Sequence, residues 1–251
     1  MTPTLRRALF AITLVATAIQ ARAADLQVAV AANFSSAAQK IAAQFENDTG
    51  HAVKLSFGST GKFYAQIEAG APFDVLLAAD QATPGKLVAE GKALPATLRT
   101  YAIGRLVLWS ADPALVDARG EVLRSGQWKH LSIADPKLAP YGQAAKEALA
   151  ALGLADAVQA RVVTGENIGQ ALQFVQSGNA ELGFVALGQV QPPDGSAVPG
   201  SMWMVPDKLY APIRQDAVVL SASKVGPVAT EFIEYLAGDK ARAVIKNYGY
   251  R

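Results

Sequence analysis

Segments with the pattern of strands alternate with segments with the pattern of helices along the first part of this chain. The strand-like runs are short and apolar, and each is followed by a stretch whose apolar residues recur at helical spacing. Repeated strand–helix units fold into a parallel sheet covered by helices, so the pattern predicts an α/β protein. The expected strands are 26–31, 52–55 and 72–80, and the expected helices are 37–45, 63–69 and 82–90.

Two longer apolar segments, 101–109 and 212–220, divide the chain into two lobes. We expect each of them to be a strand that crosses from one lobe to the other, because further strand–helix units lie between them. Those units predict strands at 131–134, 161–163 and 181–187, with helices at 143–152 and 170–176 and a helical tail at 225–246. The predicted boundaries are residues 24–104 and 216–251 for lobe 1, and residues 105–215 for lobe 2.

Residues 1–23 have the composition of a signal peptide. Arg6 and Arg7 precede an apolar stretch that is too short to span a membrane, and Ala21-Arg22-Ala23 gives a cleavage site after Ala23. We therefore expect an exported protein. The full chain has 23 Lys and Arg against 21 Asp and Glu, and three of the arginines lie in this leader, so the remaining chain has a formal charge of −1 and no bias toward nucleic acid. The chain has no Cys, which excludes disulfides and thiolate chemistry.

Four of the expected strands end in a turn that opens a helix and offers hydrogen-bond donors. Asn33 follows the first strand and Ser59 the second, while Tyr141 and Ile168 lie in the corresponding turns of the other lobe. The first N–H groups of a helix have no partner within it and carry partial positive charge, so each turn suits an anion. Because the ligands of such sheets sit beyond the carboxyl ends of the strands, we expect the four turns to face one cleft.

The four turns are rich in donors and contain one basic residue, Lys62, which lies inside the helix that follows its turn. Such a site holds a dianion by hydrogen bonds and disfavours a protonated oxyanion, since few of its groups accept. The segment 56–62 is no phosphate-binding P-loop, which needs Gly in place of Ser56, and no nucleophile elbow, which needs Gly in place of Phe57. A deaminase- or transferase-like enzyme on the same scaffold would need a base beside a nucleophile, and the turns offer neither His nor Cys.

Metal-binding residue types are scattered through the sequence. Asp74, Asp80 and Asp135 lie at the ends of expected strands, where a carboxylate facing a dianion would repel it, so we expect them to cap helices or bind hinge groups. His51 and His130 stand alone and far apart. The sequence therefore predicts neither a directly coordinated metal nor a cofactor.

With these turns identified, the chain resembles the periplasmic molybdate-binding proteins of ABC importers, of the ModA type. The resemblance covers nearly all of the chain after the expected signal peptide. Its most specific segment is QIEAGAPFDV at 66–75, followed by Ala79-Asp80-Gln81. The other matching segments are VAVAANF at 28–34, GSTGK at 58–62, ADPKLAPYG at 134–142 and GENI at 165–168.

The resemblance implies the fold of a class II periplasmic binding protein, in which two α/β lobes joined by two crossover strands close on a ligand. It implies a molybdate or tungstate ligand, no cofactor, and the membrane permease of an ABC importer as the partner. The oxyanion would be held by hydrogen bonds from residues at the positions of Ala32, Asn33, Ser59, Tyr141 and Ile168.

The chain departs from part of the family at Ala186, where some members place a ligand-binding Tyr. Tyr141 follows a different strand, and the sequence leaves open whether it uses its hydroxyl or its backbone N–H. The sequence does not separate molybdate from tungstate, and sulfate or another tetrahedral oxyanion is the alternative ligand. We expect a monomer that performs no covalent chemistry.

Overall fold

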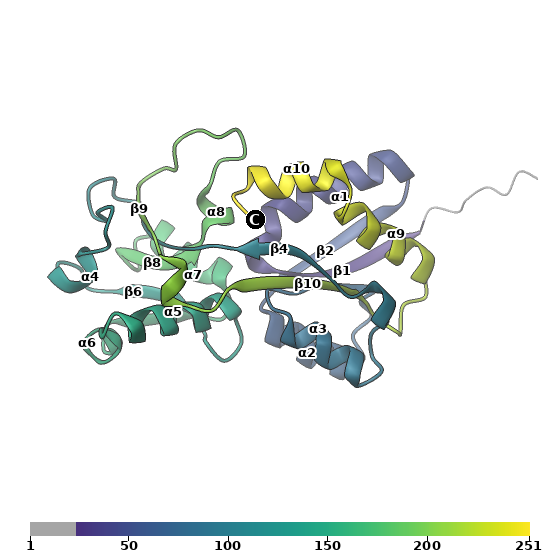
Figure 1. Cartoon of the computed structure of the whole chain (residues 1–251), viewed down its shortest axis with the longest axis horizontal. Coiled ribbons are helices and arrows are strands. Elements are labelled where there is room, and N and C mark those ends of the chain that lie inside the picture. The colour runs from purple at the N-terminus through teal and green to yellow at the C-terminus, as the bar shows by residue number, and fades with distance from the viewer. Residues whose placement is uncertain (1–23) are drawn as a thin grey trace, which may run out of the picture.

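The computed structural model describes residues 24–251, which form two lobes around two five-stranded sheets. The sheet of lobe 1 has the strand order β2-β1-β3-β10-β4, and the sheet of lobe 2 has the order β7-β6-β8-β5-β9. Figure 1 shows the lobes side by side, with β4 and β10 extending along the molecule where they meet. The expected fold of two connected α/β lobes is confirmed. The predicted signal peptide lies outside the described residues.

Lobe 1 is built on three parallel strands from the start of the chain. β1 pairs in parallel with β2 on one side and with β3 on the other, and the late strand β10 lies antiparallel between β3 and β4. The strands are β1 (Asp25–Ala31), β2 (Ala52–Gly58), β3 (Val75–Leu77), β4 (Arg99–Gly104) and β10 (Ile213–Val219).

Helices cover both faces of this sheet, and the side chains of its strands alternate between two cores. Val28 and Val30 of β1 face the helices α1, α9 and α10, whereas Ala29 between them faces α2 and α3. In the first core, Phe45 of α1 meets Phe232 of α9 edge to face, with ring centroids 5.2 Å apart. The helices are α1 (Ser35–Thr49), α2 (Thr60–Glu68), α3 (Ala82–Ala89), α9 (Gly226–Leu236) and α10 (Asp239–Asn247).

Lobe 2 repeats this arrangement with its own sheet. β6 lies between β7 and β8 in parallel, and β5 lies antiparallel between β8 and β9. Leu106 and Leu108 of β5 pack with residues of α5, whereas Val107 packs on the opposite face with residues of α7. The strands are β5 (Leu106–Ser110), β6 (Leu131–Ala134), β7 (Val162–Gly165), β8 (Leu182–Ala186) and β9 (Ser201–Met204). The helices are α4 (Val122–Ser125), α5 (Pro140–Ala151), α6 (Ala155–Gln159), α7 (Ile168–Gln176) and α8 (Leu187–Val190).

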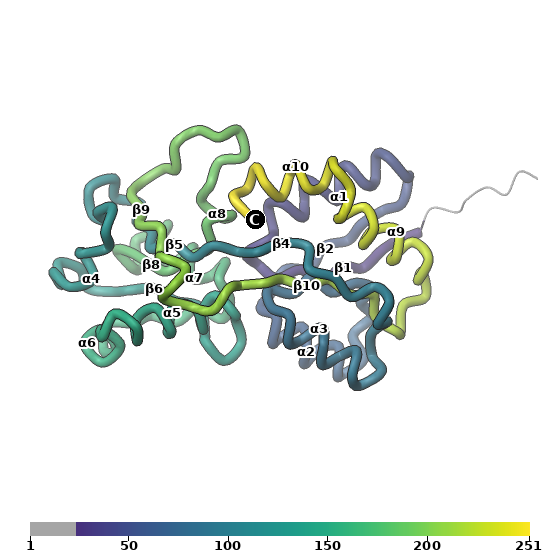
Figure 2. Tube along the Cα trace, in the orientation of Figure 1, coloured from purple at the N-terminus to yellow at the C-terminus, as the bar shows by residue number. Residues whose placement is uncertain are grey.

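The segment 101–109, expected to be one strand, consists of two strands in different sheets. β4 ends at Gly104 and β5 begins at Leu106, so the chain passes from lobe 1 to lobe 2 at Arg105. The chain returns through β10, whose first residue, Ile213, pairs with Gly104. The tube in Figure 2 shows β4 and β10 running next to each other. Residues 213–215, which the sequence assigned to lobe 2, thus pair within the sheet of lobe 1.

Other element boundaries also differ from expectation. β3 is shorter than the predicted strand 72–80, since the chain leaves the β1 pairing after Leu77. β9 was not predicted, because it is short and follows a loop rich in Pro and Gly. α2 begins at Thr60 with Ser59 as its N-cap, as the turn after the second strand indicated. The helices α5 and α7 begin three and two residues earlier than their apolar spacing indicates, so their first turns include Tyr141 and Ile168.

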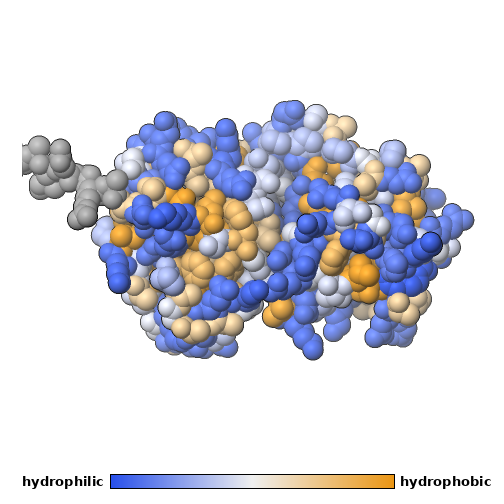
Figure 3. All heavy atoms as spheres, turned by 180° about the vertical axis from the view of Figure 1, so that it is seen from behind, coloured by the Kyte–Doolittle hydropathy of each residue, from blue (hydrophilic) through white to orange (hydrophobic). Residues whose placement is uncertain are grey.

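Hydrophilic residues cover much of the face of the molecule that Figure 3 presents. Figure 3 shows hydrophobic residues as separate patches among hydrophilic ones over both lobes on the face that it presents. Within residues 24–251, no helix is long and apolar enough to cross a membrane. The same residues contain no group of three or more His, Cys, Asp or Glu side chains placed to hold a metal ion.

Candidate functional site

A small cavity lies between the lobes, beyond the carboxyl ends of β1, β2, β6 and β7. Residues of both lobes line it, and the structure brings all five residues predicted from the sequence into this lining. Each of the five is buried, with at most 7% of its surface exposed. They are Ala32, Asn33, Ser59, Tyr141 and Ile168. Ala186, at which the chain departs from part of the expected pattern, does not line the cavity.

Two helix starts form the wall of the cavity in lobe 1. β1 runs directly into the 3-10 turn Ala32–Phe34, so the N–H groups of Ala32 and Asn33 have no partner within that turn. Ser59 is the N-cap of α2, and its hydroxyl oxygen accepts the N–H of Lys62 at 3.4 Å. Because this bond uses a lone pair of the oxygen, the hydroxyl proton is free to be donated. Capping the helix and donating to an anion are therefore compatible roles for Ser59.

Two more helix starts form the wall in lobe 2. α5 begins with Pro140, which has no N–H, so the N–H of Tyr141 is the first donor of that helix. α7 is capped by the side chain of Asn167, whose Oδ1 accepts the second and third N–H groups of the helix at 2.9 and 3.0 Å. The cap leaves the N–H of Ile168, the first of the helix, without a partner in that turn.

The side chains of Asn33 and Tyr141 are engaged at the hinge. Nδ2 of Asn33 donates to Oε1 of Gln215 at 2.8 Å and to the hydroxyl of Tyr250 at 3.2 Å. The hydroxyl of Tyr141 accepts from Nε2 of Gln215 at 3.4 Å and lies against Gly104, where a Cβ atom would collide with it. The hydroxyl of Tyr141 thus accepts a hydrogen bond from the hinge, while its backbone N–H lies at the start of α5.

The electrostatic character of the cavity comes from neutral groups. Its lining contains no Lys, Arg, His, Asp or Glu. Burial raises the pKa of Tyr141 well above its ordinary value, so this hydroxyl stays neutral. An anion in the cavity would therefore be stabilised by N–H dipoles at helix starts and by the hydroxyl of Ser59, without a counter-charge.

Contacts between the lobes surround the cavity. The N–H of Gly61 in lobe 1 donates to the carbonyl of Leu138 in lobe 2 at 2.9 Å, and a Cβ on Gly61 would lie only 3.1 Å from that oxygen. Lys62 forms an ion pair with Glu166 of lobe 2, and both side chains are about half exposed. The ammonium group of Lys62 thus pairs with a carboxylate across the lobe interface at the surface, and Lys62 does not line the cavity.

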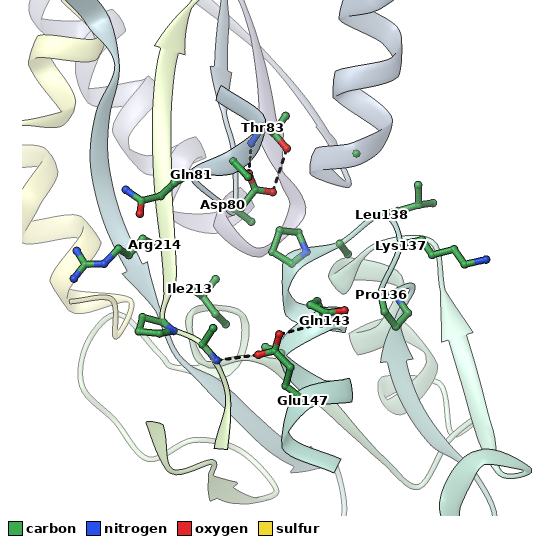
Figure 4. Close-up of a pocket in the computed structure, with 18 residues that line it drawn as sticks. Asp80, Gln81, Thr83, Pro136, Lys137, Leu138, Gln143, Glu147, Ile213 and Arg214 are labelled. Atoms are coloured by element: carbon green, nitrogen blue, oxygen red, sulfur yellow. Dashed lines mark hydrogen bonds between the residues drawn. The ribbon is translucent and has the colours of Figure 1, made fainter. Parts of the chain in front are cut away.

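A larger cavity opens on the hinge side of the same interface, between the start of α3, the helix α5 and the first residues of β10 (Figure 4). Its carboxylates are hydrogen-bonded within the protein. Asp80 accepts the N–H of Thr83 at 2.7 Å and its hydroxyl at 3.2 Å. Glu147 accepts from Nε2 of Gln143 and from the N–H of Ala211, both at 2.9 Å. Asp80 thus caps the start of α3, one of the two roles that the sequence suggested for it, and Glu147 joins α5 to the segment before β10.

Asp80 makes the stability of the fold depend on pH. Burial raises its pKa from the ordinary value of 3.8, against the lowering effect of the two bonds from Thr83, and the nearby Asp216 raises it further. The folded state therefore binds this proton more tightly than the unfolded state, and stability falls as pH rises from about 3.8 through the folded pKa. We expect Asp80→Asn, which keeps an acceptor for Thr83, to become more stable relative to wild type between about pH 4 and pH 7. Urea unfolding at several pH values measures the free energy of unfolding of both proteins. The same pH dependence of that free energy in the two proteins would contradict this prediction.

The sequence did not indicate three groups near the cavity. Asn167 was recognised as a turn residue but not as the cap of α7, although Asn before a helix is a common cap. Gln215 and Tyr250 reach the cavity residue Asn33 from 182 and 217 positions away. No local pattern predicts a contact over such a separation.

Comparison with known proteins supports this fold. Residues 26–251 match the family described as bacterial extracellular solute-binding protein. The molybdate-binding protein ModA of Azotobacter vinelandii is 57% identical over 233 residues, which cover 93% of this chain and 92% of that protein. The protein of the same name from Rhodobacter capsulatus is 48% identical over 233 residues, 93% of this chain and 90% of that one.

A solved structure agrees with the arrangement of both lobes. The periplasmic molybdate-binding protein of Azotobacter vinelandii has a TM-score of 0.88 with this chain at 45% sequence identity, and the match covers 90% of this chain and 98% of that one. Since the similarity extends over all the strands and helices that carry the cavity, this chain belongs to the ModA family of bacterial extracellular solute-binding proteins.

Proposed function

We propose that this protein captures molybdate in the cavity between its lobes and delivers it to the membrane permease of an ABC importer. The observation that carries the proposal is a cavity lined by the first N–H groups of helices from both lobes, with no charged side chain. Such a cavity suits a fully deprotonated oxyanion, because a protonated one would bring a donor that finds few acceptors. The two similar proteins that are named for molybdate binding support this choice of ligand.

In the proposed complex, the tetrahedral ion receives hydrogen bonds from both lobes at once. Lobe 1 contributes the N–H groups of Ala32 and Asn33 and the hydroxyl of Ser59, and lobe 2 contributes the N–H groups of Tyr141 and Ile168. Hydrogen bonds to a charged acceptor are each worth roughly 1.5–3 kcal/mol. The ion thus links the lobes, and the protein binds it without forming or breaking a covalent bond.

Tungstate has the same charge and shape as molybdate and nearly the same size, so we infer that the cavity binds both ions. Sulfate is the alternative ligand. It is smaller, so donors fixed on two lobes would reach its oxygens with longer and weaker bonds. We further infer that the protein acts as a monomer in the periplasm after removal of residues 1–23, with cleavage following Ala23.

A thermal and calorimetric screen of residues 24–251 tests this function. At 100 times the dissociation constant, a ligand that binds only the folded state adds about 2.7 kcal/mol of stability. We expect shifts of this size with molybdate and tungstate, and little shift with sulfate or phosphate at the same concentration. An equal shift with sulfate would assign the protein to the alternative ligand, and the absence of any shift would refute an oxyanion site.

A further inference from the structure

The C-terminal tail contacts Asn33, one of the residues that line the cavity. The hydroxyl of Tyr250 donates to the backbone carbonyl of Asn33 at 2.6 Å and accepts from Nδ2 of the same residue at 3.2 Å. Tyr250 is 5% exposed, and its ring packs edge to face on Phe34 with centroids 5.3 Å apart. One hydroxyl thus holds both the main chain and the side chain of a residue that lines the cavity.

The hinge strand holds the same side chain from a second direction. Gln215 on β10 is fully buried, and its Oε1 accepts from Nδ2 of Asn33 at 2.8 Å and from the hydroxyl of Tyr101 at 3.1 Å. Its Nε2 donates to the hydroxyl of Tyr141 at 3.4 Å. The pairing of β10 with β4 shifts register just after Gln215, the third residue of the strand that returns from lobe 2. A chain of hydrogen bonds therefore runs from Asn33 in lobe 1, through the hinge, to Tyr141 in lobe 2.

The tail also touches both lobes directly. The backbone of Arg251 exchanges two hydrogen bonds with Ile103 of β4, at 2.7 and 3.0 Å, next to the point where β4 leaves lobe 1. Its guanidinium Nη2 lies 2.8 Å from each carboxylate oxygen of Asp207, which follows β9 of lobe 2. Gly188 of α8 lies against the ring of Tyr250, where a Cβ atom would collide with it. Figure 1 shows the C-terminus at this place, beside β4 and α8 between the lobes.

We propose that Tyr250 and Gln215 are positioning residues for ligand capture, which fix Asn33 and link its placement to the hinge. The inference rests on the proposed function, because it assigns them a part in binding an oxyanion. Oδ1 of Asn33 is buried and accepts no hydrogen bond, so one polar atom of the amide is unsatisfied in this arrangement. The carboxamide of Gln215 can donate or accept, so it can hold the Asn33 amide in either orientation, including one that turns Nδ2 toward an anion. The one proton of the Tyr250 hydroxyl stays on the backbone carbonyl of Asn33 in both orientations.

The variant Tyr250→Phe tests this, since it removes the hydroxyl and keeps the ring that packs on Phe34 and Gly188. We expect its affinity for molybdate to fall about tenfold, which corresponds to about 1.4 kcal/mol. The matched control is Tyr235→Phe, which deletes a hydroxyl that donates to Asp48 at 2.8 Å in the same lobe, away from the hinge. The control is expected to bind molybdate as wild type does, whatever either variant does to the melting temperature. Wild-type affinity in Tyr250→Phe would overturn the proposal.

A double-mutant cycle separates positioning from a general loss of stability. If Tyr250 acts through Asn33, Tyr250→Phe and Asn33→Ala together should weaken binding by less than the product of their separate effects. The combination of Tyr250→Phe with Ser59→Ala should instead be multiplicative, because Tyr250 does not contact Ser59. Coupling of equal size in both cycles would contradict a specific action on Asn33.

Hydrogen exchange without any ligand keeps the two proposals distinguishable. In Tyr250→Phe, the backbone amides of residues 32–36 should exchange at least several times faster than in wild type, while those of α7 in lobe 2 keep their rates. If wild type binds no molybdate, the proposed function is wrong, and the exchange rates of residues 32–36 alone decide whether Tyr250 positions Asn33. Unchanged exchange at residues 32–36 would show that Tyr250 does not hold Asn33.

Discussion

Ser59→Asp is expected to abolish molybdate binding while leaving the fold intact. Asp is as good an N-cap as Ser, so α2 keeps its first turn. The new carboxylate would face a dianion in a cavity that has no cation in its lining. Two unit charges about 4 Å apart interact by about 4 kcal/mol at an effective dielectric constant of about 20, and the second charge of the ion increases the repulsion. We expect a loss of at least about three decades in affinity, measured by calorimetry at neutral pH.

The uncharged control for this substitution is Ser59→Asn, which has the same size and also caps helices. It accounts for any steric effect of a longer side chain in the small cavity. The difference between Asp and Asn therefore reports the charge alone. An Asp variant that binds within tenfold of the Asn variant would show that residue 59 does not face the anion.

Ile168→Pro is expected to weaken molybdate binding by about one to two decades. Proline is accepted at the first position of a helix, where Ile168 stands, and Asn167 before it already has the extended conformation that precedes proline, with φ −146° and ψ 173°. The substitution thus removes one N–H donor from lobe 2 and keeps the start of α7. A hydrogen bond to a charged acceptor is worth roughly 1.5–3 kcal/mol, which gives the expected range by titration.

Ile168→Ala is the control, because it loses more of the buried side chain but keeps the N–H. We expect this variant to be less stable than wild type yet to bind molybdate with nearly the same affinity. Small-angle scattering adds a second measurement, since a donor in lobe 2 is needed for the ion to hold the lobes together. Wild type should become more compact with molybdate, and Ile168→Pro less so. Equal affinity and equal compaction in the two variants would exclude Ile168 as a ligand contact.

The α/β fold and the lining of the cavity were predictable because both follow from local patterns. Apolar runs followed by helical spacing gave the parallel strands, and small or polar residues at the turns marked the helix starts that face the cavity. Ser59 illustrates this, since a Ser before a helix indicates a cap wherever it occurs. The family resemblance then selected the ligand, which no turn alone would identify.

The hinge was harder to predict, because its structure depends on contacts between distant segments. The apolar pattern continues through Arg105, so one strand was expected where the chain changes from one sheet to the other. Gln215 is a polar residue in an apolar strand, and its role depends on partners in three other segments. Tyr250 lies in the last two residues of the chain, where the sequence suggests no particular role, and only the folded structure brings its hydroxyl to Asn33. Such contacts have no periodicity and therefore no local pattern in the sequence.

The strand order of lobe 1 has a consequence for how this chain acquires its structure. β10 separates β3 from β4 in the sheet, yet it comes after all of lobe 2 along the chain. Lobe 2, whose strands are contiguous from β5 to β9, can collapse by itself, whereas lobe 1 must wait for residues synthesised last. Until β10 has been synthesised, the helices α1, α2 and α3 of lobe 1 can pack only on the parallel strands β1, β2 and β3.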